Sequence, residues 1–110
     1  MKIYKIDEMT RGWFIGDFEP SILKTKDFEV GILSFPKGYK KPAHYHKIAT
    51  EYNVLISGTF TTNNVTLNPG DIFVIESGEV VDPIFHEDCS ILCVKVCLLY
   101  TSPSPRDQRG

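Results

Sequence analysis

The feature that most constrains this chain is the regular spacing of its short apolar runs. Several runs alternate apolar with polar side chains, and glycine, proline or asparagine interrupts them at intervals of about 8–12 residues, which is typical of an all-β sandwich or barrel. Residues 21–26 are the only candidate for a helix. We expect strands at residues 3–6, 28–35, 43–47, 51–56, 59–62, 65–67, 72–75, 80–85 and 90–96.

Length and composition bound the class of protein. The chain has 110 residues, enough for one domain with one core, and we expect that domain to span residues 1–96. No apolar run approaches the roughly 20 residues that span a membrane, and no signal-peptide stretch opens the sequence, so we expect a cytoplasmic protein without a membrane partner. The formal charge of −2 argues against nucleic acid as the main partner.

The last residues differ from the rest. Residues 97–110 contain two prolines and two arginines, and the alternating strand pattern stops at Val96. This segment resembles the translation of a sequencing adapter read through at the end of an open reading frame from environmental (metagenomic) DNA. We expect residues 97–110 to be a non-native tail; a genuine polar tail is the alternative.

The domain itself then keeps two cysteines, Cys89 and Cys93. On one strand their Cα atoms would lie about 13 Å apart, whereas a disulfide requires roughly 7 Å or less. We expect both to be buried free thiols.

Two histidines one residue apart carry the clearest chemistry. On a strand, His44 and His46 project from the same face, about 6–7 Å apart at their bases, while Tyr45 points to the other face. Glu51, arriving on the next strand, can add a carboxylate oxygen. Two imidazoles and one carboxylate are the ligand set of many zinc and non-haem iron(II) sites. The alternative is a surface pair of histidines on an exposed strand.

The spacing around these residues resembles the first motif of the cupin superfamily. That motif reads Gly, five residues, His-x-His, four residues, Glu, six residues, Gly. Its fixed positions here are Gly38, His44, His46, Glu51 and Gly58. The resemblance implies a single jelly-roll barrel that binds a divalent metal (Fe, Mn, Zn or Ni) through the two histidines and the glutamate.

The second cupin motif matches only in part. Residues 68–71 resemble its start and residues 77–79 occupy its turn, but its histidine is missing. The position falls on Val81, or on Asp82 if the turn is one residue longer. Valine cannot bind a metal, whereas aspartate can, so Asp82 is a candidate fourth ligand. An exposed aspartate at a strand irregularity is the alternative, and His86 is interpreted as a surface histidine.

Other residues near the motif are candidates for lining a substrate pocket. Asn53 shares the inward face of its strand with Glu51, whereas Tyr52 faces away. Tyr39, on the preceding loop, could reach the mouth of the barrel. Trp13 could stack on a ligand, although such aromatics more often belong to a core or a dimer interface.

Two functions from different classes follow. One is a metal-binding enzyme acting on a small sugar-like or anionic metabolite as an isomerase, epimerase, lyase or dioxygenase. The other is a non-catalytic module, with a viral source as one alternative, that binds or sequesters a sugar or nucleotide. The partial second motif leaves both open. Small cupins commonly dimerise, so the resemblance also implies a homodimer.

Overall fold

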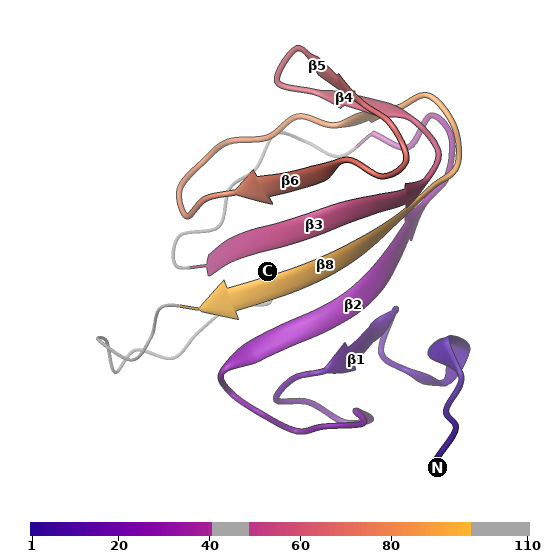
Figure 1. Cartoon of the computed structure of the whole chain (residues 1–110), viewed down its shortest axis with the longest axis vertical. Coiled ribbons are helices and arrows are strands. Elements are labelled where there is room, and N and C mark those ends of the chain that lie inside the picture. Colours follow the sequence, from indigo (N-terminus) through magenta and orange to yellow (C-terminus); the bar gives the residue numbers. More distant parts are fainter. Residues whose placement is uncertain (41–48, 98–110) are drawn as a thin grey trace.

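The computed structural model describes residues 1–40 and 49–97 (Figure 1). Within them the regular structure is almost entirely strand, as the sequence predicts. The elements are η1 (Ile6–Glu8), β1 (Trp13–Ile15), β2 (Phe28–Phe35), β3 (Ala49–Ser57), β4 (Phe60–Thr62), β5 (Val65–Leu67), β6 (Ile72–Ile75), β7 (Ile84–Phe85) and β8 (Cys89–Cys97). The strand predicted at residues 43–47 lies outside the described residues, as do residues 98–110 of the predicted tail.

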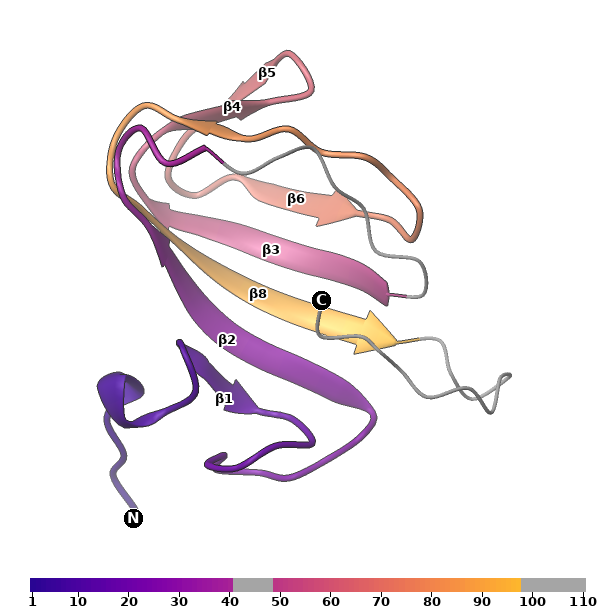
Figure 2. The ribbon, with the colours of Figure 1, turned by 180° about the vertical axis from the view of Figure 1, so that it is seen from behind.

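The strands form two antiparallel sheets. The larger has the order β1-β2-β8-β3-β6, and the smaller has the order β5-β4-β7. Figures 1 and 2 show the larger sheet curving from β1 at one edge to β6 at the other, with the β4–β5 hairpin beyond β6. Sequence neighbours such as β2 and β3 are separated by β8, which is the crossover expected of a jelly roll. Among the described strands the two sheets stay separate and do not close into a barrel.

The core lies between the two sheets. Leu55 of β3 is completely buried, and Phe60, Phe85, Cys89 and Ile91 surround it with at most 6% exposure. Three of these residues come from β3 and β8 of the larger sheet and two from β4 and β7 of the smaller sheet. Burying these apolar side chains together is the main force that holds the sheets face to face.

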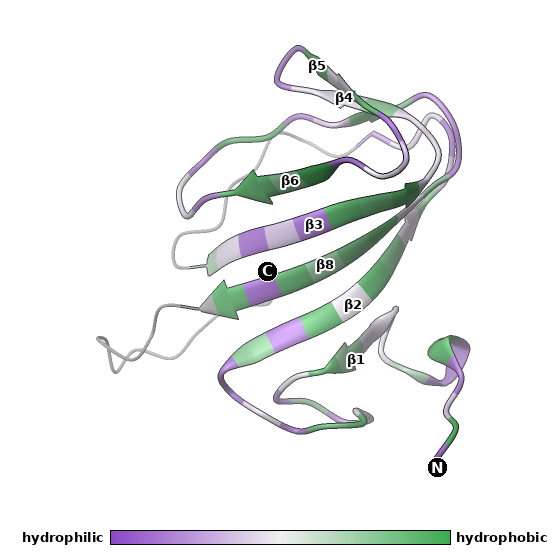
Figure 3. Ribbon diagram, viewed as in Figure 1, coloured by the Kyte–Doolittle hydropathy of each residue, from purple (hydrophilic) through white to green (hydrophobic). Residues whose placement is uncertain are grey.

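Strand β8 lies at the centre of the larger sheet, and its inward side chains change from apolar to charged along the strand. Its inward positions are Cys89, Ile91, Cys93 and Lys95, all buried. Lys95 is directly opposite both Glu29 of β2 and Glu51 of β3. Figure 3 shows this as hydrophilic segments on three neighbouring strands near one end of an otherwise hydrophobic sheet.

The hairpin between β4 and β5 confirms the turn predicted from sequence. Asn63 and Asn64 have φ values of 53° and 64°, in the left-handed region that asparagine tolerates. Thr61 pairs with Thr66 across the two strands, and their hydroxyls lie 3.0 Å apart.

Two N-terminal segments depart from the sequence prediction. Residues 3–6 do not form the predicted strand: Ile3 is 75% exposed, and Ile6 begins the single turn η1. The apolar alternation there is misleading, because the side chains it would bury remain at the surface.

The candidate helix at residues 21–26 is not a helix. Its backbone bonds to β1 instead: Ile22 N donates to Phe14 O at 2.8 Å, and Gly16 N donates to Leu23 O at 3.1 Å. These pairings use the groups that a helix would need for its own hydrogen bonds.

The strand predicted at residues 80–85 is reduced to Ile84–Phe85. Pro83 has no backbone N–H to donate to a neighbouring strand, and the backbone N–H of Asp82 donates to the hydroxyl of Thr62 instead. The last strand, β8, ends at Cys97, one residue beyond the predicted end.

Cys89 and Cys93 are buried and free, as the sequence predicts. In the described part of the chain, no helix is long and apolar enough to cross a membrane.

Candidate functional site

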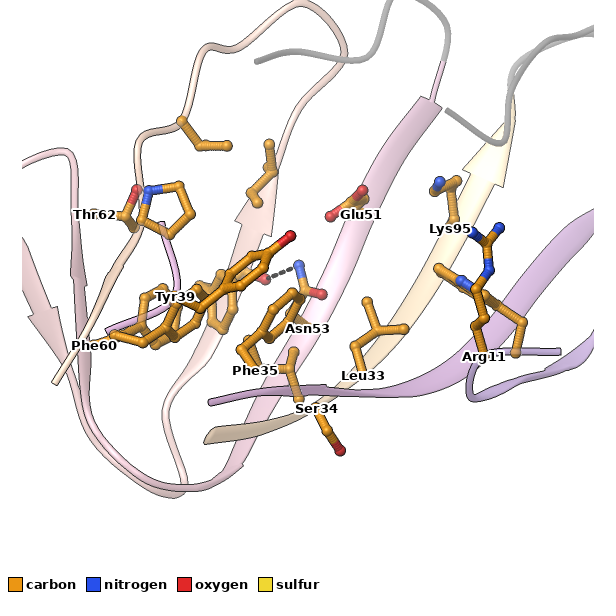
Figure 4. Close-up of a pocket in the computed structure, with 17 residues that line it drawn as sticks. Arg11, Leu33, Ser34, Phe35, Tyr39, Glu51, Asn53, Phe60, Thr62 and Lys95 are labelled. Carbon is orange, nitrogen blue, oxygen red and sulfur yellow. Dashed lines mark hydrogen bonds between the residues drawn. The ribbon is translucent and has the colours of Figure 1, made fainter. Parts of the chain in front are cut away.

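A pocket of about 440 Å³ opens on the inward face of the larger sheet (Figure 4). Its walls come from both sheets and from the segments that precede β1, follow β2 and precede β7. The lining residues are Arg11, Trp13, Leu33, Ser34, Phe35, Tyr39, Glu51, Asn53, Phe60, Thr62, Phe73, Ile75, Val81, Pro83, Phe85, Ile91 and Lys95.

Strand alternation on β3 places Glu51 and Asn53 in this pocket. Tyr52, between them, points outward and is 49% exposed. Asn53 is 3% exposed, and its Nδ2 donates to Phe73 O of β6 at 3.5 Å, a long bond that sets the orientation of the amide. Figure 4 shows Glu51 and Asn53 in the middle of the pocket, one above the other along the strand.

Tyr39 also lines the pocket, next to an aromatic wall. Its ring centroid lies 5.7 Å from that of Phe35 and 6.2 Å from that of Phe85, and these two phenyl rings stack at 4.6 Å. Phe60 packs against Phe85 at 5.1 Å. The wall keeps one side of the pocket apolar, while 41% exposure leaves Tyr39 accessible at its edge.

The predicted ligands His44 and His46 lie outside the described residues. Strand β3 begins at Ala49, so the chain that carries them leads directly into the strand that bears Glu51. Within residues 1–40 and 49–97 there is no group of three or more His, Cys, Asp or Glu side chains that could hold a metal ion. A metal centre of the predicted kind therefore depends on the two histidines together with Glu51.

The structure does not bring Asp82 together with Glu51. Asp82 is exposed and is absent from the pocket lining. Its carboxylate accepts a hydrogen bond from Asn63 N at 2.9 Å, and this bond stabilises the turn of the β4–β5 hairpin. Val81, one residue earlier, is 7% exposed and faces the pocket. Of the two positions considered for the missing histidine, the inward one is therefore occupied by valine.

His86 also lies away from the pocket. Its Nε2 is 2.7 Å from the hydroxyl oxygen of Thr61, and the residue is exposed, in agreement with its interpretation as a surface histidine.

Sequence reasoning missed two cations in the pocket, Arg11 and Lys95. Lys95 is 3% exposed, and its Nζ lies 5.1 Å from the centroid of the Trp13 ring, within the range of a cation–π contact. A signal for it existed: Lys95 is the one charged residue in the last strand, and it has the same parity as the buried Cys93. The position of Arg11 left no comparable signal, because it depends on the turn before β1.

Gly31 makes room for Trp13 at this end of the pocket. A Cβ atom at position 31 would lie 2.7 Å from Cε3 of the tryptophan ring and 3.0 Å from the carbonyl oxygen of Gly12. The missing side chain on β2 thus allows the indole to pack against this strand, with Lys95 Nζ over its ring.

Burial and nearby charges shift the pKa of the Cys93 thiol. Burial raises its pKa, the negative charge of Glu51 raises it further, and the positive charge of Lys95 lowers it. The thiol therefore stays protonated at neutral pH. A protonated thiol is a poor nucleophile and a poor metal ligand.

No family model and no curated protein matches this chain. Solved structures do. A conserved protein with a double-stranded β-helix domain from Klebsiella pneumoniae is 21% identical over 87% of this chain and 84% of its own, with a TM-score of 0.63. KdgF from Halomonas sp. is 20% identical over 66% and 71%, with a TM-score of 0.60. A cupin-2 domain containing protein from Shewanella frigidimarina is 23% identical over 68% and 76%, with a TM-score of 0.59.

These similarities establish the fold. The chain has the jelly-roll, double-stranded β-helix fold of cupin structures, which is the architecture that the first motif implied. At these identities the function of the similar proteins does not transfer with the fold.

Proposed function

We propose that this cupin binds a small molecule in the pocket beside a divalent metal ion held by His44, His46 and Glu51. The observation that carries the proposal is the position of Glu51: the motif's carboxylate faces a pocket of about 440 Å³ and lies two residues from the buried amide of Asn53. A pocket of this size with a few convergent polar groups on an apolar wall is typical of small-molecule sites.

The donor chemistry fits a divalent first-row metal ion. Two neutral imidazoles and one carboxylate leave coordination positions open, as a site that must also accept a ligand requires. The described residues supply the carboxylate, and the two histidines immediately before β3 would supply the nitrogens. A bound ion would provide Lewis-acid polarisation of a ligand oxygen.

The chain's own residues would orient and shield the ligand. The Nδ2 of Asn53 donates to Phe73 O, and among the described residues its carbonyl oxygen accepts no hydrogen bond, so that oxygen can accept one from a ligand hydroxyl. Tyr39 can donate or accept a hydrogen bond at the edge of the pocket. The stacked rings of Phe35 and Phe85 would cover an apolar face of the ligand and exclude water from it.

Whether the site also catalyses a reaction depends on a proton donor or acceptor. Isomerase, epimerase, lyase and dioxygenase chemistry are the candidate activities, and among the described residues Tyr39 is the phenol that lines the pocket. Binding without catalysis is favoured by Val81, since the inward one of the two positions considered for the motif's histidine is apolar and buried here.

Elemental analysis of purified protein tests the proposal. We expect about one equivalent of a divalent metal in the unmodified chain and its loss in His44→Ala and Glu51→Gln. Asp82→Asn is the matched control, because it removes a carboxylate charge outside the pocket and should retain the metal. A metal-free native protein whose thermal stability does not change with added Fe²⁺, Mn²⁺, Zn²⁺ or Ni²⁺ would remove the metal from the proposal.

A further inference from the structure

The end of the pocket formed by Arg11, Trp13 and Lys95 contributes no ligand to the proposed metal site. Figure 4 places Arg11 and Lys95 together at this end, opposite Phe60 and Thr62, with Asn53 and Glu51 between. We propose that Lys95 and Arg11 form a subsite for the anionic group of the ligand, a carboxylate or a phosphate. This inference rests on the proposed function, because it concerns the same pocket.

The burial of Lys95 carries the first step. A buried ammonium group is costly unless it is paired or hydrogen-bonded. Lys95 is 3% exposed, yet among the described residues its Nζ has no carboxylate oxygen within 4.0 Å. Its described contact is the face of Trp13, at 5.1 Å, which attracts a cation but does not accept its hydrogen bonds as an oxygen does.

Two glutamates, Glu29 and Glu51, are opposite Lys95 in the sheet and compensate its charge at longer range. Glu29 does not line the pocket, and Glu51 is the carboxylate assigned to the metal. Among the described residues, the charged groups that line the pocket are thus two cations and one anion, and a bound metal would neutralise the carboxylate. The pocket then attracts an anion.

Arg11 supplies the geometry that a single ammonium lacks. A guanidinium presents two parallel N–H donors that match the oxygens of a carboxylate or phosphate. Arg11 is held in an unusual turn, with φ of 50°, immediately before Gly12, whose backbone oxygen accepts a hydrogen bond from Ile32 N at 3.0 Å. The turn is thereby anchored to β2, and its side chain reaches the pocket from the exposed edge.

The chain carries its own reporter for this subsite, because Trp13 is its only tryptophan. The experiment titrates the full chain, treated with chelator, with malonate and with malonamide, which has the same shape without charge, and follows Trp13 fluorescence and heat of binding. We expect malonate to bind at least about tenfold more tightly than malonamide, since charge-assisted hydrogen bonds carry that much affinity. A parallel titration with inorganic phosphate distinguishes the two anion classes.

Variants assign the effect to residues. Lys95→Met should weaken malonate binding about 10- to 100-fold and Arg11→Gln about tenfold, and neither should change malonamide binding. Arg11 is exposed, so Arg11→Gln keeps the test valid if Lys95→Met fails to fold. Malonate and malonamide of equal affinity, or no binding of either anion at tens of millimolar, would overturn the subsite, as would malonate binding unchanged in Arg11→Gln.

Glu51→Gln separates this subsite from the proposed metal site. In the chelated protein it should strengthen malonate binding, because it removes a negative charge from the pocket. Weaker malonate binding in chelated Glu51→Gln would count against the subsite. Metal content, measured separately on the same variant, tests only the metal site.

Discussion

Replacing Gly58 with alanine should destabilise the domain more than the same change at Gly78, although both glycines have φ of +87°. The left-handed conformation alone costs an alanine about 1–2 kcal/mol, and this cost applies equally to the two variants. At Gly78 no atom of residues 1–40 or 49–97 lies within 4 Å of the added Cβ. Gly78→Ala should therefore show the conformational cost alone.

At Gly58 the added Cβ also meets neighbouring backbone. It would contact the carbonyl oxygen of Asp88, and it would lie 2.7 Å from Sγ and 2.9 Å from Cα of Cys89. Overpacking of this kind costs about 1–3 kcal/mol, so Gly58→Ala should lose about 2–5 kcal/mol of unfolding free energy in total. The difference between the variants corresponds to about 4–24 °C in Tm for a domain of this size.

Urea unfolding of both variants, followed by circular dichroism, measures the two free energies. Equal losses in Gly58→Ala and Gly78→Ala would refute the argument that crowding by the β7–β8 turn, rather than the φ angle alone, requires glycine at the end of the first motif. A larger loss at Gly78 would contradict it equally.

Three further predictions concern the site and its surroundings. Gly31→Ala should displace the Trp13 ring, shift its fluorescence and cost about 1–3 kcal/mol of unfolding free energy; unchanged emission would contradict the packing described. Asp82→Ala should cost about 0.5–1.5 kcal/mol in urea unfolding, because Asn63 N loses its acceptor, and metal content should stay unchanged; metal loss would make Asp82 a ligand. Burial raises the pKa of the Cys93 thiol above its ordinary value of 9.0, so above about pH 9 the unfolded chain releases a proton that the folded chain keeps, and stability falls as pH rises; Cys93→Ala should reduce that slope, and an unchanged slope would show that Cys93 does not cause it.

Much of the fold could be predicted because its signals are local. Turn chemistry identified the Asn63–Asn64 hairpin, and the period-two pattern identified β2, β3 and β8 within two residues of their ends. The predictions failed at residues 3–6 and 21–26, because the sequence does not specify which segment, if any, each of them pairs with. Residues 3–6 have a strand-like pattern without burial, and residues 21–26 bond to β1 rather than to themselves.

By itself, the sequence determined which faces of β3 carry chemistry. Alternation is a property of the extended backbone, so it placed Glu51 and Asn53 on one side and Tyr52 on the other without knowledge of any partner strand. Only the tertiary structure decided what stands opposite them. Strand pairing brought Lys95 beside Glu51, and the turn before β1 brought in Arg11. The tertiary structure also placed Val81 inward and Asp82 outward. Pairing of distant segments depends on the register of the whole sheet and not on any local pattern.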